Sequence, residues 1–146
     1  MSPTRTKLVE WLATKEVSGS TLDIGGNIWS MQGKVKSFGG EYKTMDESDW
    51  DLNHEMHYFG EFDNIFCTEV MQFLYDPHSA LARLRTALKP GGKLYLSFHL
   101  THPPMKDHDY LRYTRKGIEK LLQVTGLKTK EFLEPLPGYY LVQCYR

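Results

Sequence analysis

The segment "LDIGGN", Leu22–Asn27, places one acid and two glycines where the backbone could bind a ligand. An apolar run carries Asp23 into Gly25 and Gly26, and Asn27 follows them. Glycine lacks a Cβ, so its backbone can approach a ligand closely and adopt positive φ angles. A turn from strand to helix uses glycine for the same reason. The segment alone therefore predicts a turn and leaves ligand binding open.

A second acid, Asp46, follows the glycines by about 20 residues, at the end of the next strand-like run. An acid at this place can accept hydrogen bonds from both hydroxyls of a ribose, as in dinucleotide sites. The alternative is a solvated acid that caps the following loop, because Asp is common at loop entries. Together with the glycine turn, Asp46 favours a site for a ligand that contains adenosine.

Three histidines, His99, His102 and His108, occur close together in "HLTHPPMKDH". A metal site needs ligands that converge at suitable spacing. Pro103 and Pro104 stiffen the chain and direct it away from the first two histidines. We therefore expect no metal here, and we place this segment beside the ligand because it follows the carboxyl end of a strand.

The composition predicts a cytoplasmic globular protein. The chain has 146 residues, 40% of them apolar and 25% charged, and this length suits a single domain over 1–146. The 18 basic and 18 acidic residues cancel, so nucleic acid is not indicated as a partner. No apolar run is long enough to span a membrane, and the first residues lack the apolar core of a signal peptide. Cys67 and Cys144 lie in separate strand-like runs, which fits buried thiols in a reducing compartment.

Strand-like and helix-like segments alternate along the chain. Strands are predicted at Thr21–Gly25, Tyr42–Asp46, Phe62–Glu69 and Lys93–Leu100, with a C-terminal hairpin over 127–134 and 139–146. Helices are predicted over 4–16 with Thr4 or Thr6 as N-cap, over 28–38, over 76–88 with Asp76 as N-cap, and over 113–125. This alternation favours an α/β fold, in which a mostly parallel sheet carries helices on both faces and an antiparallel hairpin at its edge. Such sheets bind ligands beyond the carboxyl ends of their strands.

The segment "FDNIFCTEVMQFLYDPHSALARLRTALKPGGKLYLSFHL", from Phe62 to Leu100, resembles the centre of class I S-adenosylmethionine-dependent methyltransferases. The segment "HDYLRYTRKGIEKLL" resembles a motif of one branch of that family. The resemblance extends from about Leu22 to Leu127. It implies a Rossmann-like fold, S-adenosylmethionine as cofactor, and methyl transfer to an acceptor that the sequence does not identify.

The resemblance also assigns cofactor-binding roles to individual residues. The backbone at Asp23, Gly25, Gly26 and Asn27 would face the methionine part of the cofactor, and Asp46 would bind the ribose. Asp51 would meet the adenine amino group with Leu52 beside the ring, and Thr68 and Glu69 would line the inner side of the cofactor.

The residues that follow the predicted strand Lys93–Leu100 include four candidates for the substrate side of the site: His102, His108, Arg112 and Tyr113. An oxygen or nitrogen acceptor needs a general base, and either histidine or the tyrosine could serve. Arg112 could bind an acidic acceptor or pair with Asp109 on the surface. The spacing does not single out one catalytic residue.

The chain departs from the family pattern in three places. Asn27 and Trp29 occupy the second and third glycine positions, where Trp29 would either lie near the carboxylate end of the cofactor or pack under the sheet. Gln72 and Phe73 replace the usual Glu-His pair. Only 35 residues separate Gly26 from Phe62, so about one strand-helix unit is expected to be missing. These departures leave open the alternative of a non-catalytic binding or accessory protein with an eroded cofactor site.

The unassigned segment Glu47–Glu61 mixes acids with aromatic residues, including Trp50 and Phe59. Such a segment can cover only part of a sheet face, and bare apolar surface usually marks an interface. We therefore expect a homodimer that uses the surface near these two aromatics. A compact monomer, in which they fold back onto the sheet, is the alternative.

Overall fold

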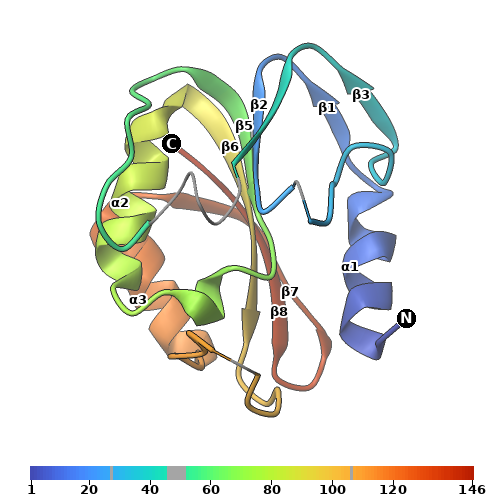
Figure 1. Ribbon diagram of the computed structural model, residues 1–146, viewed down its shortest axis with the longest axis vertical. Helices are drawn as coiled ribbons and strands as arrows, with labels where there is room; N and C mark the ends of the chain where they lie inside the picture. The colour runs from blue at the N-terminus through green and yellow to red at the C-terminus, as the bar shows by residue number, and fades with distance from the viewer. Residues whose placement is uncertain (27, 46–51, 106) are drawn as a thin grey trace.

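The computed structural model describes residues 1–26, 28–45, 52–105 and 107–146, and Figure 1 shows their arrangement. The helical elements are α1 (Pro3–Leu12), η1, a 3₁₀ turn (Met71–Phe73), α2 (Pro77–Ala87) and α3 (Arg115–Thr125). The strands are β1 (Glu16–Ser18), β2 (Thr21–Ile24), β3 (Ser37–Gly39), β4 (Tyr42–Met45), β5 (Phe62–Cys67), β6 (Leu88–His99), β7 (Lys128–Leu136) and β8 (Tyr139–Tyr145).

The main sheet has the strand order β4-β2-β5-β6-β8-β7. The first four strands in this order run parallel, with Asp23 opposite Thr44 on one side and Phe66 on the other. Strand β8 pairs antiparallel with both β6 and β7, so that Leu96 lies opposite Val142. The predicted parallel sheet with an antiparallel C-terminal hairpin is therefore confirmed.

Helices cover both faces of this sheet, as predicted (Figure 1). Helices α2 and α3 lie on one face, where Leu81 and Ile118 belong to the larger cluster of buried side chains. Helix α1 lies on the other face, where Leu8 packs in a smaller cluster with Phe66 and Tyr95, whose rings stack at 4.2 Å. The helices thereby leave the two ends of the sheet to be closed by loops.

The helix predicted over 28–38 is wrong. The described residues of this segment form turns and then β3, which pairs in parallel with β1 through Val17 and Phe38. Gly33 has a φ of +95°, which is incompatible with an α-helix. The N–H of Met31 donates to the Asp23 carboxylate instead of to a helical carbonyl. Tertiary pairing and the buried acid therefore override a weak local helix pattern.

The start of α1 also differs from the prediction. The N-cap is Ser2, not Thr4 or Thr6, because the Ser2 Oγ accepts the N–H of Arg5 at 3.2 Å. Pro3 then occupies the first helical position, where its missing N–H costs nothing. Helix α2 begins as predicted, with the Asp76 side chain accepting the N–H of Ser79.

The connection between β4 and β5 is short, and its described part, residues 52–61, contains no helix. This segment runs alongside α2, where Arg83 donates to the Leu52 carbonyl at 2.7 Å and Gly60 donates to that of Thr86 at 2.8 Å. Phe59 is 71% exposed, whereas Trp50 lies outside the described residues. The homodimer through these two aromatics therefore stays a prediction.

Cys67 and Cys144 are both free and buried, as predicted. Within the described ranges, every helix is too short or too polar to cross a membrane.

Candidate functional site

The glycine turn lies at the carboxyl end of β2, at the edge where parallel sheets bind ligands. Gly25 has a φ of +80°, and its N–H donates to the Met45 carbonyl at 2.7 Å, which ties the turn to β4. Among the described residues, a Cβ placed on Gly25 would meet only the Cγ2 of Val70, at 3.9 Å. The described part of the turn therefore faces the residues that follow β5.

Asp23 shapes this turn from inside the protein. Its buried Oδ2 accepts the N–H of Met31 at 2.9 Å and the hydroxyl of Tyr42 at 2.6 Å. A Cβ on Gly26 would lie only 2.6 Å from the same oxygen, so Gly26 leaves room for the acid. Burial raises the pKa of Asp23 to about 6, although both hydrogen bonds lower it. The Asp23 side chain thus stabilises the turn through hydrogen bonds inside the protein. The backbone of the turn, rather than the Asp23 carboxylate, is then the part that can face a ligand.

The residues after β5 form a polar network at the same edge, centred on Glu69. Its Oε2 lies 2.6 Å from the Nε2 of His99, and its Oε1 accepts the Tyr139 hydroxyl at 2.6 Å. Its N–H donates to the Ser97 hydroxyl at 2.6 Å, and its φ of +60° is unusual for a residue other than glycine. Thr68, the other residue predicted here, is buried.

Electrostatics fix the charge of this network. Burial raises the pKa of Glu69. The hydrogen bond and the charge of His99, and then the hydrogen bond from Tyr139, lower this pKa by more, so that it lies below its usual range. The positive charge of Arg5 in α1 acts in the same direction. Burial and the neighbouring carboxylate raise the pKa of Tyr139. Glu69 is therefore an anion held by neutral or cationic donors.

The sequence did not single out Arg5 or Tyr139, and it placed His99 only within the segment expected beside the ligand. The antiparallel pairing of β6 with β8 places Tyr139 opposite His99, and the sequence alone does not show this pairing. The guanidinium of Arg5 lies 4.3 Å from the ring centre of Trp29, with the ammonium of Lys34 at 4.4 Å. Trp29 is half-buried against the smaller cluster, so of the two roles left open for it, packing is the one observed.

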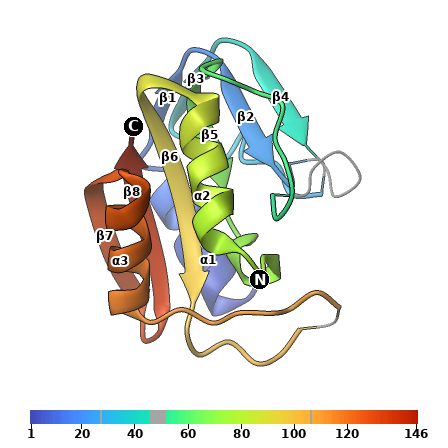
Figure 2. The same ribbon diagram turned by 90° about the vertical axis from the view of Figure 1, so that its left-hand side faces the viewer.

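Arg112 pairs with Asp109, one of the two roles left open for it. Its two terminal nitrogens lie 2.5 Å and 2.8 Å from the two oxygens of the Asp109 carboxylate. The hydrogen bond from Arg112 lowers the pKa of Asp109 to about 2. Arg112 also donates to the carbonyls of His102 and Pro103. It therefore holds the loop between β6 and α3, which lies along the carboxyl edge of the sheet (Figure 2).

The other three substrate-side candidates lie in different surroundings. Tyr113 does not suit the substrate side, because it is buried and its hydroxyl donates to the Met71 carbonyl at 2.7 Å. His108 is exposed and contacts the Tyr110 hydroxyl. The ring of His102 lies 4.8 Å from that of His99, so His102 is the candidate that adjoins the Glu69 network.

The adenine end of the predicted site is described only in part. Asn27, Asp46 and Asp51 lie outside the described residues, so their cofactor roles stay predictions. Leu52 is fully buried in the larger cluster, which gives its side chain a packing role that the sequence did not predict. In the part of the chain that the structure describes, no three potential metal ligands cluster together.

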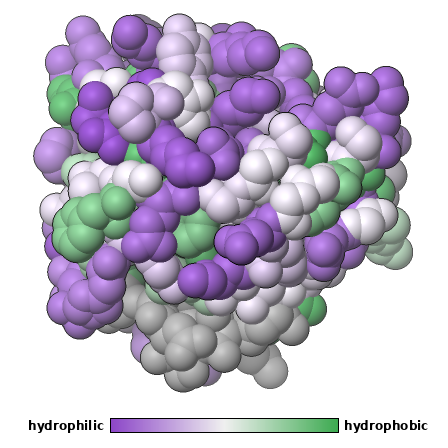
Figure 3. Space-filling model, turned by 90° about the horizontal axis from the view of Figure 1, so that it is seen from above, coloured by the Kyte–Doolittle hydropathy of each residue, from purple (hydrophilic) through white to green (hydrophobic). Residues whose placement is uncertain are grey.

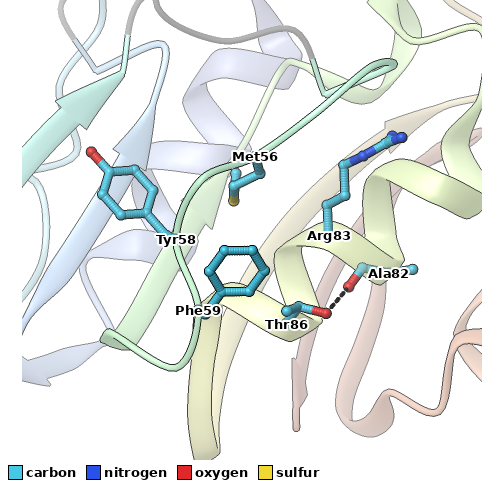
Figure 4. A pocket seen from close by; sticks show the side chains of 6 residues that line it. All are labelled: Met56, Tyr58, Phe59, Ala82, Arg83 and Thr86. Carbon is cyan, nitrogen blue, oxygen red and sulfur yellow. Dashed lines mark hydrogen bonds between the residues drawn. The ribbon is translucent and has the colours of Figure 1, made fainter.

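A hollow of about 190 Å³ lies elsewhere, between the segment 56–59 and the second half of α2 (Figure 4). Its lining residues are Met56, Tyr58, Phe59, Ala82, Arg83 and Thr86. The segment that lines this hollow leads directly into the amino end of β5. The hollow therefore lies away from the carboxyl edge of the sheet. The surface at the amino ends of the strands is mostly hydrophilic, with scattered apolar residues (Figure 3). The carboxyl edge is therefore the candidate site.

Parts of this chain are similar in sequence to known proteins. The chain is 27% identical over 92 residues to a "Ubiquinone biosynthesis O-methyltransferase" of Aromatoleum aromaticum, a match that spans 51% of this chain and 39% of that protein. It is 25% identical over 109 residues to the protein of the same name from Thiobacillus denitrificans, spanning 62% of this chain and 45% of that protein. The matches thus span less than half the length of these relatives.

A solved structure described as an S-adenosylmethionine-dependent methyltransferase from Mesorhizobium loti has the same fold. It superposes with a TM-score of 0.71 over 99% of both chains at 13% identity. The family model described as "Methyltransferase domain" matches residues 3–130. The chain therefore belongs to the class I S-adenosylmethionine-dependent methyltransferase family.

Proposed function

We propose that this chain transfers the methyl group of S-adenosylmethionine to a hydroxyl oxygen of an acceptor molecule. The observation that carries the proposal is the glycine turn at Gly25, which faces Val70 beside the Glu69 network. Relatives named as O-methyltransferases support oxygen as the accepting atom.

The residues present fit the cofactor that the family uses. In the described part of the chain, no side chain comes closer than 3.9 Å to a Cβ built on Gly25. Thr68 and Glu69 lie at the neighbouring strand end, where we assign them to the inner side of the cofactor. Asp46 and Asp51 are assigned to the ribose and the adenine on the basis of the sequence. When bound, the cofactor supplies an electrophilic methyl group on a sulfonium.

The protein then has to align the acceptor, exclude water and take up one proton. The oxygen–methyl bond forms as the sulfur–methyl bond breaks, and the hydroxyl proton leaves to a base. We assign this base to His102, because its ring adjoins His99, which Glu69 holds in place. An acceptor hydroxyl at this edge would lie between the turn and the loop that follows β6.

Calorimetric titration with S-adenosylhomocysteine tests the proposal. This ligand keeps the adenosine and the amino acid part of the cofactor, so an intact site should bind one molecule per chain saturably. Absence of binding would favour the alternative, an accessory protein on the same fold.

Gly25→Ala tests the location of the cofactor. The added Cβ would enter the space before the turn, so we expect the affinity for S-adenosylhomocysteine to fall about tenfold or more. Gly33→Ala is the matched control, because Gly33 also has a positive φ and no atom of the described residues lies within 4 Å of an added Cβ. Both variants should lose about 1–2 kcal/mol of stability through backbone strain. Equal affinities of the two variants would show that the turn does not face the cofactor.

A further inference from the structure

Gln72, in η1, carries a buried polar atom that no described residue satisfies. The residue is 2% exposed, and none of the residues that the structure describes forms a hydrogen bond with its side-chain oxygen, Oε1. An unsatisfied buried acceptor costs free energy, about 1–3 kcal/mol, and protein structures rarely retain one without a reason. The η1 turn directly follows the Glu69 network, so this oxygen lies beside the proposed site.

The orientation of the Gln72 amide follows from its neighbours. Its Nε2 donates to the Glu69 carbonyl at 3.3 Å, and a carbonyl can only be approached favourably by a donor. If the two amide atoms were exchanged, Oε1 would lie against the Glu69 carbonyl oxygen, and the two oxygens would repel each other. The orphaned atom is therefore the oxygen, and the missing partner is a hydrogen-bond donor.

The loop between β6 and α3 covers Gln72. The backbone carbonyl of Gln72 accepts the N–H groups of Tyr110 and Leu111 at 2.9 Å and 3.2 Å, which fixes the loop over η1. The thioether of Met105 lies 4.0 Å from Nε2 of Gln72. Methionine is flexible and apolar, so its side chain can leave this place to a ligand at small cost.

Exposed aromatic rings stand beside this point. Tyr75 and Tyr110 are 49% and 51% exposed, and their ring centres are 5.7 Å apart in an edge-to-face arrangement. Tyr110 belongs to the loop that covers Gln72, and its backbone is bonded to Gln72. The two segments that meet at Gln72 therefore each carry an exposed aromatic ring, and such rings bind planar ligands favourably.

We propose that Oε1 of Gln72 accepts a hydrogen bond from the hydroxyl of an aromatic methyl acceptor. This inference rests on the proposed function, because it names the residue that orients the hydroxyl toward the methyl group. As an amide, Gln72 does not take the proton. It holds the oxygen in place and selects acceptors that carry a donor.

The first test concerns the protein without ligand. Gln72→Met keeps the length of the side chain and removes the orphaned oxygen, so its melting temperature should be no lower than that of the parent. Gln143→Met is the matched control, because Oε1 of the buried Gln143 accepts the ammonium of Lys15 at 3.0 Å. That variant should melt about 3 °C lower. An equal loss in Gln72→Met would mean that Gln72 serves the fold, which overturns the proposal.

The second test uses phenol and toluene, which differ by a hydroxyl in place of a methyl group. Their dissociation constants are measured by NMR titration of protein saturated with S-adenosylhomocysteine. The preference for phenol over toluene should fall about fivefold in Gln72→Met and stay unchanged in Gln143→Met. Gln72→Asn, which withdraws the amide by one methylene, should lose the same preference and provides a second variant.

Three outcomes count against the proposal and can be told apart. If S-adenosylhomocysteine itself fails to bind, the proposed function fails. If it binds but phenol does not bind within its solubility, the assignment of a hydroxyl-bearing ring is overturned. If phenol binds and the preference is the same in the parent and in Gln72→Met, Gln72 does not contact the acceptor.

Discussion

Glu69→Ala should lower the free energy of unfolding by about 2–4 kcal/mol, measured by urea denaturation at pH 7. The carboxylate accepts the buried hydroxyl of Tyr139 and lies 2.6 Å from the Nε2 of His99, which is 2% exposed. Removing it leaves both groups buried without their partner. The cost is therefore larger than that of losing a solvated ion pair.

The exposed Glu119 provides the control for this prediction. It pairs with Arg115 at 3.0 Å, and the side chains of both are about half exposed. Glu119→Ala should change stability by less than about 1 kcal/mol. In a Tyr139→Phe background, Glu69→Ala should cost about 1 kcal/mol less, since one donor is no longer orphaned. A loss equal to that of Glu119→Ala would mean that the network does not stabilise the edge.

Asp23→Asn should change the pH dependence of stability, with the variant gaining up to about 3 kcal/mol over the parent between pH 4 and pH 7. Burial raises the pKa of Asp23 from 3.8 to about 6 in the folded protein. Between these values the folded state keeps a proton that the unfolded state releases. The contribution of Asp23 is thus fully present below about pH 4 and is lost as the pH rises through 6.

The Asn side chain can still accept the hydrogen bonds of Met31 and Tyr42 through its oxygen, and it carries no charge to bury. Urea denaturation at pH 4, 5, 6 and 7 measures the difference between variant and parent. Asp63→Asn is the control, since the hydrogen bond from the Ser20 backbone lowers the pKa of Asp63 and its difference should stay level between pH 5 and 7. Parallel curves for Asp23→Asn and the parent would contradict a buried, protonatable Asp23.

The strands of the main sheet, helix α2 and helix α3 could be predicted because their signals are local, whereas β1 and β3 were not predicted. Asp76 and Pro77 begin α2, and Gly126 ends α3 with a φ of +75°. The parallel order could be inferred because strands and helices alternate and the last two strands are adjacent in sequence. The pairing of Arg112 with Asp109 could also be foreseen, since the two residues are three apart.

The structure of the candidate site depends on contacts between residues far apart in the chain. Glu69 meets Tyr139 across 70 positions, and Gln72 meets Met105 across 33. Tyr113 resembled a substrate-side residue because it carries a hydroxyl, but that hydroxyl donates to Met71, 42 positions away. The sequence by itself thus determined the strands of the main sheet and the helices α2 and α3, and it predicts that a ligand binds at the carboxyl edge of this sheet. Only the tertiary structure decided which polar side chains form hydrogen bonds inside the protein and are therefore not available to a ligand. Burial and long-range hydrogen bonds exist only once distant segments have packed together.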